Sequence, residues 1–263
     1  MAFIEVDGAR IQYRFDGPAE APVLVLANSL GTDLSMWEVQ LPSFAQSFRV
    51  LRYDSRGHGQ SAVTPGPYTI ERLAGDVIGL LDGLEIRRAH FCGLSLGGMI
   101  GMWLGAHAPE RVERLALCNT AAYIGPPELW NTRIDAVRQG GMQAIAAAVI
   151  ERWFTPSFRE HSPEAVERVR QTLLAAPPDG YIACCAAVRD MDQRDTVSLI
   201  RAPTLVIAGS QDMATPPADG RFLSERIQGA QYVELEAAHL SNIEAADRFT
   251  ETVRSFLTTE ETR

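Results

Sequence analysis

Three residue types that together make a serine nucleophile occur along the chain in the order serine, aspartate, histidine. Ser95 is the centre of Gly93–Gly97, G-L-S-L-G, which fits the pattern G-x-S-x-G, and Asp212 and His239 follow it. A serine hydroxyl is a weak nucleophile at neutral pH, so it needs a nearby base and an acid that orients the base. These residues predict attack on a carbonyl carbon, with Ser95 as nucleophile, His239 as base and Asp212 as acid.

The residues on either side of Ser95 predict a strand, a very tight turn and a helix. Residues 90–94 are short and apolar, as in a buried strand, and apolar residues recur at helical spacing over residues 96–104. The glycines two residues before and after the serine let strand and helix close up around it. The free N–H of Leu96 then lies at a helix N-terminus, where it can stabilise an oxyanion. The alternative is an ordinary turn between a strand and a helix.

A second oxyanion donor is expected in the loop that follows residues 23–27. Those residues form an unbroken apolar run, typical of a central parallel strand, and the polar loop Asn28–Asp33 comes next. Ligands of open α/β sheets bind at the carboxyl ends of the strands. The N–H of Leu30 is the candidate donor, because Gly31 lets the chain turn sharply enough to aim it. An ordinary connecting loop is the alternative.

The acid and the base each follow a predicted strand near the end of the chain. Asp212 comes shortly after the strand at residues 204–209. His239 lies between a strand at residues 232–235 and an amphipathic helix at residues 242–257. Ser, then Asp, then His is the order that accompanies a G-x-S-x-G turn. All three residues are therefore expected at one edge of the sheet.

A second usual place for the acid cannot supply one here. The position follows the predicted strand at residues 112–118, and it holds Asn119 and Thr120, which have no carboxylate. Asp212 is therefore the candidate acid.

The other histidines suit the role of base less well. His58 follows a predicted strand at residues 49–53 and lies between two glycines near Asp54, which is typical of a turn. The remaining ones are expected to be structural or, for the last, on the surface: His90, His107 and His161.

The order of the predicted elements indicates an α/β protein. Residues 3–6 and 11–15 flank Asp7-Gly8, a hairpin signal, so the sheet is expected to begin with an antiparallel edge. From residue 123 to about residue 196 only amphipathic helices are predicted. We expect a mostly parallel central sheet flanked by helices, with core residues 1–121 and 197–263 and a helical cap insertion at residues 122–196.

Composition excludes several classes of function. The chain has 263 residues, of which 46% are hydrophobic, so it can bury one substantial core. A net charge of -9 opposes binding to nucleic acid or to an anionic membrane surface. Every basic residue is arginine, which excludes a Schiff-base lysine, a pyridoxal phosphate anchor and a Walker lysine. We expect no cofactor and no metal.

Cysteine usage and the N-terminal residues bear on the compartment. The four cysteines lack metal-ligand spacing and lie in apolar or helical surroundings, so reduced, buried thiols are expected. The first residues show no basic region followed by an apolar run, and no segment has the length and apolarity of a membrane span. The interpretation is a cytoplasmic protein.

With these residues in hand, the chain resembles the α/β-hydrolase superfamily over nearly its whole length, and within it the 3-oxoadipate enol-lactonases. A serine at the tight turn argues against dehalogenase and epoxide hydrolase chemistry, which uses a carboxylate nucleophile. One departure is that the usual His-Gly before the oxyanion residue is replaced by Asn28-Ser29 here. The resemblance is carried by N-S-L-G-T-D at Asn28, F-C-G-L-S-L-G-G-M at Phe91, E-R-W-F-T at Glu151, V-R-D-M-D-Q-R-D at Val188 and A-A-H-L-S-N-I-E at Ala237.

The resemblance implies that the enzyme opens the enol-lactone ring through an acyl-enzyme on Ser95, in aromatic catabolism. The substrate is a small anionic lactone, and its carboxymethyl anion should meet an arginine of the cap when buried. Arg133 is the candidate, because Trp130 lies three residues before it on the same helix face and could add a stacking wall. An exposed Arg133 paired with a nearby carboxylate is the alternative. Further candidate substrate-binding residues are Ser29 and Trp153, and Arg189 and Arg194 are other possible cations.

Two other functions stay open. Related perhydrolases and broad carboxylesterases share most of the quoted motifs. A receptor that binds a lactone without turnover is an alternative from a different class, although the complete set of three catalytic residue types argues against it. The sequence does not give the oligomeric state.

Overall fold

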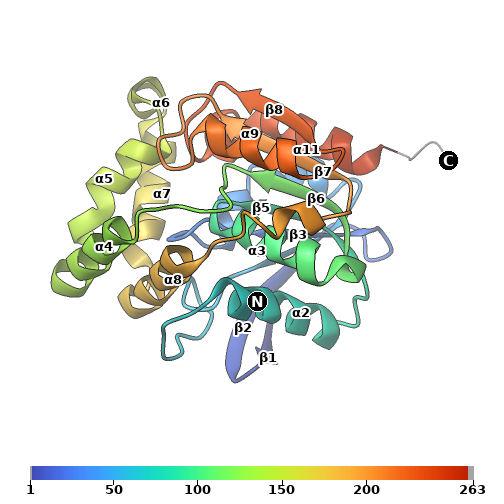
Figure 1. The fold of residues 1–263 in the computed structure, drawn as a ribbon, viewed down its shortest axis with the longest axis horizontal. Coiled ribbons are helices and arrows are strands. Elements are labelled where there is room, and N and C mark those ends of the chain that lie inside the picture. The colour runs from blue at the N-terminus through green and yellow to red at the C-terminus, as the bar shows by residue number, and fades with distance from the viewer. Residues whose placement is uncertain (1, 260–263) are drawn as a thin grey trace.

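A computed structural model describes residues 2–259 and contains an eight-stranded sheet at its centre (Figure 1). The strands lie in the order β1-β2-β4-β3-β5-β6-β7-β8. Their bounds are Ala2–Val6 (β1), Ala9–Asp16 (β2), Val23–Ala27 (β3), Arg49–Tyr53 (β4), Ala89–Leu94 (β5), Val112–Cys118 (β6), Thr204–Gly209 (β7) and Gln231–Leu235 (β8).

The sheet is antiparallel at one edge and parallel elsewhere. β1 pairs antiparallel with β2 across Asp7 and Gly8, both of which have positive φ. β2 is antiparallel to β4, and the remaining neighbours are parallel, from β4 and β3 through to β8. The predicted antiparallel edge is therefore confirmed, as is the α/β class with a mostly parallel sheet.

Helices cover both faces of the sheet. Helices α2, α3 and α9 pack on one face, where Gly101 and Gly105 of α3 approach Leu115 and Gly220 of α9 approaches Val206. Helix α11 packs with α1, and the Arg114 guanidinium on the opposite side of β6 lies over Phe256 of α11. The bounds are Leu41–Phe44 (α1), Ile70–Gly83 (α2), Leu96–His107 (α3), Pro217–Arg226 (α9), Ser241–Glu244 (α10) and Ala246–Thr258 (α11), with short 3₁₀ helices at Leu34–Trp37 (η1), Pro109–Arg111 (η2) and Val197–Leu199 (η3).

Between β6 and β7 the chain forms helices only. Five α-helices of this segment gather at one end of the molecule, beside the sheet (Figure 1). Their bounds are Pro127–Gly140 (α4), Gln143–Trp153 (α5), Pro156–His161 (α6), Pro163–Ala175 (α7) and Pro178–Asp190 (α8). We refer to α4–α8 as the cap; the exact division at residues 122 and 196 stays a prediction.

Four of the five cap helices begin with proline, and α5 begins with a glutamine, Gln143. Proline suits the first helical position, because its fixed φ is already helical and its missing N–H would have no partner inside the helix. The prolines therefore mark where these four cap helices start.

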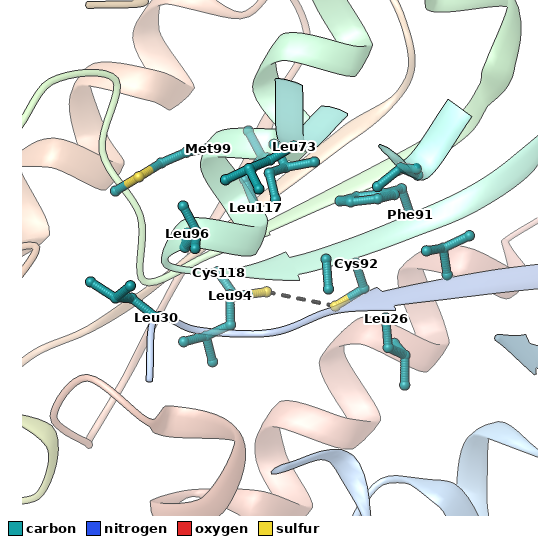
Figure 2. Packing of buried hydrophobic residues seen from close by; sticks show 14 of the residues in the cluster. Leu26, Leu30, Leu73, Phe91, Cys92, Leu94, Leu96, Met99, Leu117 and Cys118 are labelled. Carbon is teal, nitrogen blue, oxygen red and sulfur yellow. Dashed lines mark hydrogen bonds between the residues drawn. The ribbon is translucent and has the colours of Figure 1, made fainter. Parts of the chain in front are cut away.

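The core is continuous around the central strands. Leu26, Phe91 and Leu117 on neighbouring strands belong to one buried cluster with Leu73 of α2 (Figure 2). The sulfur atoms of two cysteines on β5 and β6 lie 3.9 Å apart as free thiols. All four cysteines are free and buried, which confirms that part of the sequence interpretation. Among residues 2–259, none of the helices combines the length and apolar composition needed to cross a bilayer.

The helices near the C-terminus differ from the sequence prediction in two places. The expected single helix at residues 242–257 is divided at Ala245, whose backbone (φ -114, ψ 45) is not helical. The reason is tertiary, because the Asn242 side chain donates to the Met36 carbonyl and the Asn242 carbonyl accepts from Gln40, which fixes α10 separately. Helix α9 has no counterpart in the prediction, since few of its residues are buried and no apolar periodicity marks it.

The loop after β4 is organised by a buried carboxylate. Asp54 accepts hydrogen bonds from the N–H groups of Leu34 (2.8 Å) and Gln60 (2.8 Å). Burial raises the pKa of Asp54 to about 6, although those two hydrogen bonds oppose the rise. The folded protein therefore binds a proton here at pH values where the unfolded chain has released it.

We predict that this group makes the protein less stable as the pH rises from about 4 to about 6. The pKa is raised on folding, so the stabilisation is complete below the unfolded pKa and is lost as pH passes the folded value. The contribution of Asp54 to the free energy of unfolding should fall by about 3 kcal/mol over this range. Urea unfolding of the wild type and of Asp54→Asn, which cannot ionise, measures it: the wild type's free energy of unfolding should fall relative to that of the variant over this range. A difference that stays constant from pH 4 to pH 6 would contradict the prediction.

Candidate active site

Ser95 occupies a strained turn between β5 and α3. Its backbone angles are φ 57 and ψ -115, a region that residues with side chains rarely adopt. The turn is held from two sides, because the Ser95 N–H donates to the Cys118 carbonyl (2.9 Å) and the Thr120 hydroxyl donates to the Ser95 carbonyl (2.8 Å). The hydroxyl of Ser95 is thereby presented at the carboxyl end of the strands.

Two glycines make this turn possible by close backbone approach. A Cβ atom on Gly93 would lie 2.2 Å from the Gly97 carbonyl oxygen, and one on Gly97 would lie 2.2 Å from the Ala27 carbonyl oxygen. Both contacts are with backbone atoms, which cannot move aside as a flexible side chain can. The pattern G-x-S-x-G thus follows from packing between β5, α3 and β3.

Asp212 and His239 form a buried hydrogen-bonded pair. The Nδ1 atom of His239 lies 2.8 Å from Oδ2 of Asp212, and both side chains are almost completely buried. Asp212 also accepts from the N–H groups of Ala214 (2.8 Å) and Thr215 (2.9 Å) and from the Thr215 hydroxyl (2.8 Å). Since Nδ1 faces the carboxylate, Nε2 is the ring nitrogen available for proton transfer.

The electrostatic surroundings keep Asp212 ionised. Burial alone raises the pKa of its carboxyl, but His239, Thr215 and Asn119 together lower it by more. The pKa of Asp212 therefore lies below its usual range, and the carboxylate is charged at neutral pH. An ionised carboxylate can stabilise the imidazolium that forms when the histidine accepts a proton.

Asn119 is part of this network, although it carries no charge. Its amide donates to Oδ2 of Asp212 (3.0 Å) and to the Ala238 carbonyl (3.2 Å), and its carbonyl oxygen accepts from the Ser241 hydroxyl (2.5 Å). Asn119 thus joins the acid to the segment that carries His239. The sequence alone shows only that this position lacks a carboxylate, because no local signal marks the three contacts.

The segment that carries the base is also tied to the cap. The Leu240 N–H donates to the Trp153 carbonyl at the end of α5 (3.1 Å). The Glu244 carboxylate accepts from the Ala238 N–H (3.0 Å) and from both the N–H and the hydroxyl of Thr155. The position of His239 is therefore coupled to the position of the cap.

A small cavity lies between the cap and these residues. Its volume is about 40 Å³, more than the ~10–15 Å³ that a cavity needs to hold one water molecule. Ser95 and His239 line it together, and four further residues named from the sequence line it too: Ser29, Leu30, Arg133 and Trp153. The other lining residues are Ile124, Val149, Arg152, Ala214 and Thr215.

Two arginines of the cap reach this cavity. Arg133 lies over the indole ring of Trp130, 4.9 Å from its centroid, and Arg152 comes from the end of α5. Among the residues that the structure describes, neither forms an ion pair with a carboxylate. Trp130 is not among the lining residues, and its Nε1 donates to the Ile124 carbonyl (3.0 Å). Trp130 therefore contacts Arg133 without lining the cavity, and its part in substrate binding stays a prediction.

The other arginines considered from the sequence have partners elsewhere. Arg189 bonds to Asp190 (2.7 Å), and Arg194 bonds to Asp192 (2.5 Å). Neither lines the cavity. The sequence does not single out Arg152, because its approach to the cavity depends on the angle between α5 and the sheet.

The two expected oxyanion donors lie at the same end of the sheet. Leu30 follows β3 and Leu96 opens α3, and β3 and β5 are parallel neighbours (Figure 2). The loop after β3 and the first turn of α3 are therefore adjacent.

The backbone hydrogen bonds leave both donors available. The N–H groups on either side of Leu30, those of Ser29 and Gly31, donate to the Met36 sulfur and to His58. Within residues 2–259 the N–H of Leu30 itself has no protein acceptor. The N–H of Leu96 is the first of a helix, so no carbonyl of that helix can accept it.

Comparison with known proteins agrees with this architecture. Residues 22–167 match the family described as the alpha/beta hydrolase fold. The chain is similar to 3-oxoadipate enol-lactonase 2 of Acinetobacter baylyi, with 44% identity over 94% of this chain and 92% of the relative. It is 38% identical to 3-oxoadipate enol-lactonase 1 of the same organism, over 95% of this chain and 94% of the relative. A crystal structure of the enol-lactonase from Burkholderia xenovorans superposes with a TM-score of 0.97 at 50% identity, covering 98% of this chain and 100% of that one.

We predict that Gly97→Ala disrupts the turn at Ser95. The added methyl group must push α3 away from the Ala27 carbonyl, so the reaction of Ser95 with a fluorophosphonate should slow by at least about 100-fold. Gly75→Ala is the matched control, because its Cβ meets nothing within 4 Å on the exposed side of α2. The control should keep full reactivity and gain about 0.4–1 kcal/mol of stability. Equal reactivity of the two variants would show that the close approach is not required.

Proposed function

The chain belongs to the alpha/beta hydrolase fold family, and from that premise we propose that it opens the ring of 3-oxoadipate enol-lactone. The observation that carries the proposal is that Ser95, His239 and Arg133 line one cavity. Among residues 2–259, Arg133 has no carboxylate partner. The first two residues supply a nucleophile and a base, and the third supplies a cation for the carboxymethyl group of the substrate. The enol-lactonase relatives favour this substrate over a neutral ester.

The first half of the reaction forms an acyl-enzyme. His239 takes the proton from the Ser95 hydroxyl as the oxygen attacks the lactone carbonyl carbon. The negative oxygen of the tetrahedral intermediate accepts hydrogen bonds from the N–H groups of Leu30 and Leu96. Collapse of this intermediate breaks the bond between the carbonyl carbon and the ring oxygen. The ring oxygen takes the proton back from His239 as an enol, which tautomerises to the ketone.

The second half of the reaction releases the product. His239 removes a proton from water, and the resulting hydroxide attacks the ester carbon on Ser95. The same two N–H groups hold the second oxyanion, and Ser95 leaves with the proton from His239. The product therefore carries two carboxylates, one from the substrate and one formed by hydrolysis.

The two cap arginines divide between these carboxylates in the proposed reaction. A buried carboxylate without a partner costs several kcal/mol, so the substrate anion needs a cation inside a protein whose net charge is -9. Arg133, supported by Trp130, binds the carboxymethyl group. Arg152 lies at the same cavity and is available to the second carboxylate. The partner of the protein is thus a small anionic lactone, and the cytoplasmic location stays a prediction that four free thiols favour.

Ser95→Ala is expected to abolish lactone opening. Removal of the nucleophile should lower kcat by at least about 10⁴-fold while substrate binding and the fold are retained. Ultraviolet absorbance of the enol-lactone measures turnover, and circular dichroism measures the fold. Multiple turnover at the wild-type rate in this variant would refute the proposal, and a single turnover without release in the wild type would favour the receptor alternative.

Arg133→Ala separates an anionic-lactone enzyme from a broad carboxylesterase. Loss of a charged hydrogen bond should lower kcat/KM for the enol-lactone by about 10- to 100-fold, mainly through KM, and should change turnover of a neutral aryl ester little. Arg138→Ala is the matched control, because it removes the same charge from α4 at a residue that pairs with Asp135. Equal losses on lactone and aryl ester would contradict the assigned role of Arg133.

A further inference from the structure

His58 lies behind the loop that carries Leu30, outside the cavity. It follows β4 between Gly57 and Gly59, and its side chain is only 1% exposed. Its Nε2 atom lies 2.9 Å from the backbone nitrogen of Gly31. Because a backbone N–H can only donate, Nε2 must be the unprotonated ring nitrogen and the ring proton must be on Nδ1.

The surroundings of the ring favour this neutral form. Burial lowers the pKa of His58 to about 4, although the Arg56 carbonyl and the charge of Asp33 oppose the decrease. Tyr181 of α8 packs against the ring, with centroids 6.5 Å apart, and the Cys184 sulfur lies 3.9 Å from Nδ1. Nε2 of His58 is therefore available as an acceptor throughout the neutral pH range.

The hydrogen bond from Gly31 fixes one end of the loop. Gly31 has φ +83, and a Cβ atom there would lie 2.7 Å from the Leu173 side chain, so only glycine fits. The other end is fixed at Asn28, whose side chain donates to the Tyr53 carbonyl (2.7 Å) and whose carbonyl accepts from the Gly97 N–H (3.0 Å). The N–H of Leu30 lies between these two anchors.

We propose that His58 is a positioning residue for the oxyanion hole, acting through the hydrogen bond that it accepts from the Gly31 N–H. This bond sets the plane of the peptide that joins Leu30 to Gly31. The neighbouring Leu30 N–H then points toward the carbonyl attacked by Ser95. The inference rests on the role proposed above for Leu30.

A purely structural role for His58 makes a different prediction. If the ring only fills space, any side chain of similar volume should serve equally well. If the acceptor atom Nε2 of His58 matters, a side chain with an oxygen at the position of Nε2 should restore activity and an apolar side chain should not. Glutamine and methionine form this pair, because they have similar length and only glutamine ends in a strong hydrogen-bond acceptor.

The experiment compares His58→Gln and His58→Met with the wild type. His58→Met should lower kcat by about 10- to 100-fold with KM within about twofold, because the lost stabilisation acts on the transition state. The affinity for a boronic acid that forms a tetrahedral adduct with Ser95 should fall by the same factor. His58→Gln should stay within about fivefold of the wild type in both measurements. Cys184→Ala is the control: it removes a neighbour of Nδ1, leaves the bond from Gly31, and should keep kcat.

Equal kcat values for the glutamine and methionine variants, or a loss expressed through KM alone, would overturn the proposal. A nitrogen-15 NMR spectrum of the wild type gives a test that needs no variant to fold: His58 must carry its proton on Nδ1, and a proton on Nε2 overturns the proposal. Every kinetic measurement is repeated with an aryl acetate. A wild type that hydrolyses the aryl acetate but not the enol-lactone refutes the proposed substrate while the comparison at His58 still stands.

Discussion

The site depends on one steric constraint, the close approach of β3, β5 and α3 around Ser95. The serine keeps a positive φ because Gly93 and Gly97 let carbonyl groups come within van der Waals contact of their Cα atoms. The same approach places the loop after β3 next to the first turn of α3. The hydroxyl of Ser95 and the N–H groups of Leu30 and Leu96 are thus arranged by packing of the backbone.

The cap adds two arginines to this backbone framework. A strongly acidic protein repels an anionic substrate at long range, so attraction must come from local cations. Arg133 and Arg152 provide them at the cavity without carboxylate partners among the described residues. The contacts of Glu244 and Leu240 with the cap tie the segment that carries His239 to the helices that carry Arg133 and Arg152. In the proposed reaction, a displacement of the cap therefore affects both substrate binding and proton transfer.

The features that could be predicted from the sequence are those that leave a local pattern. The strands β3, β4, β6 and β7 agree with the prediction at their observed bounds, because each is a short segment rich in apolar residues between polar loops. The contacts of Asn119, Arg152 and His58 could not be predicted, because each joins segments distant in the chain. The division of the last helix at Ala245 escapes prediction for the same reason, since its cause is a set of hydrogen bonds to residues 36–40.

The small volume of the cavity has a consequence particular to a cyclic substrate. A linear ester releases its alcohol after acylation and so vacates space for water, whereas an opened lactone keeps its leaving oxygen attached to the acyl chain. In the proposed reaction this oxygen therefore stays near the ester carbon, where it can close the ring again. Conversion of the enol to the ketone removes that competing nucleophile, so in the proposed reaction the tautomerisation opposes closure of the ring.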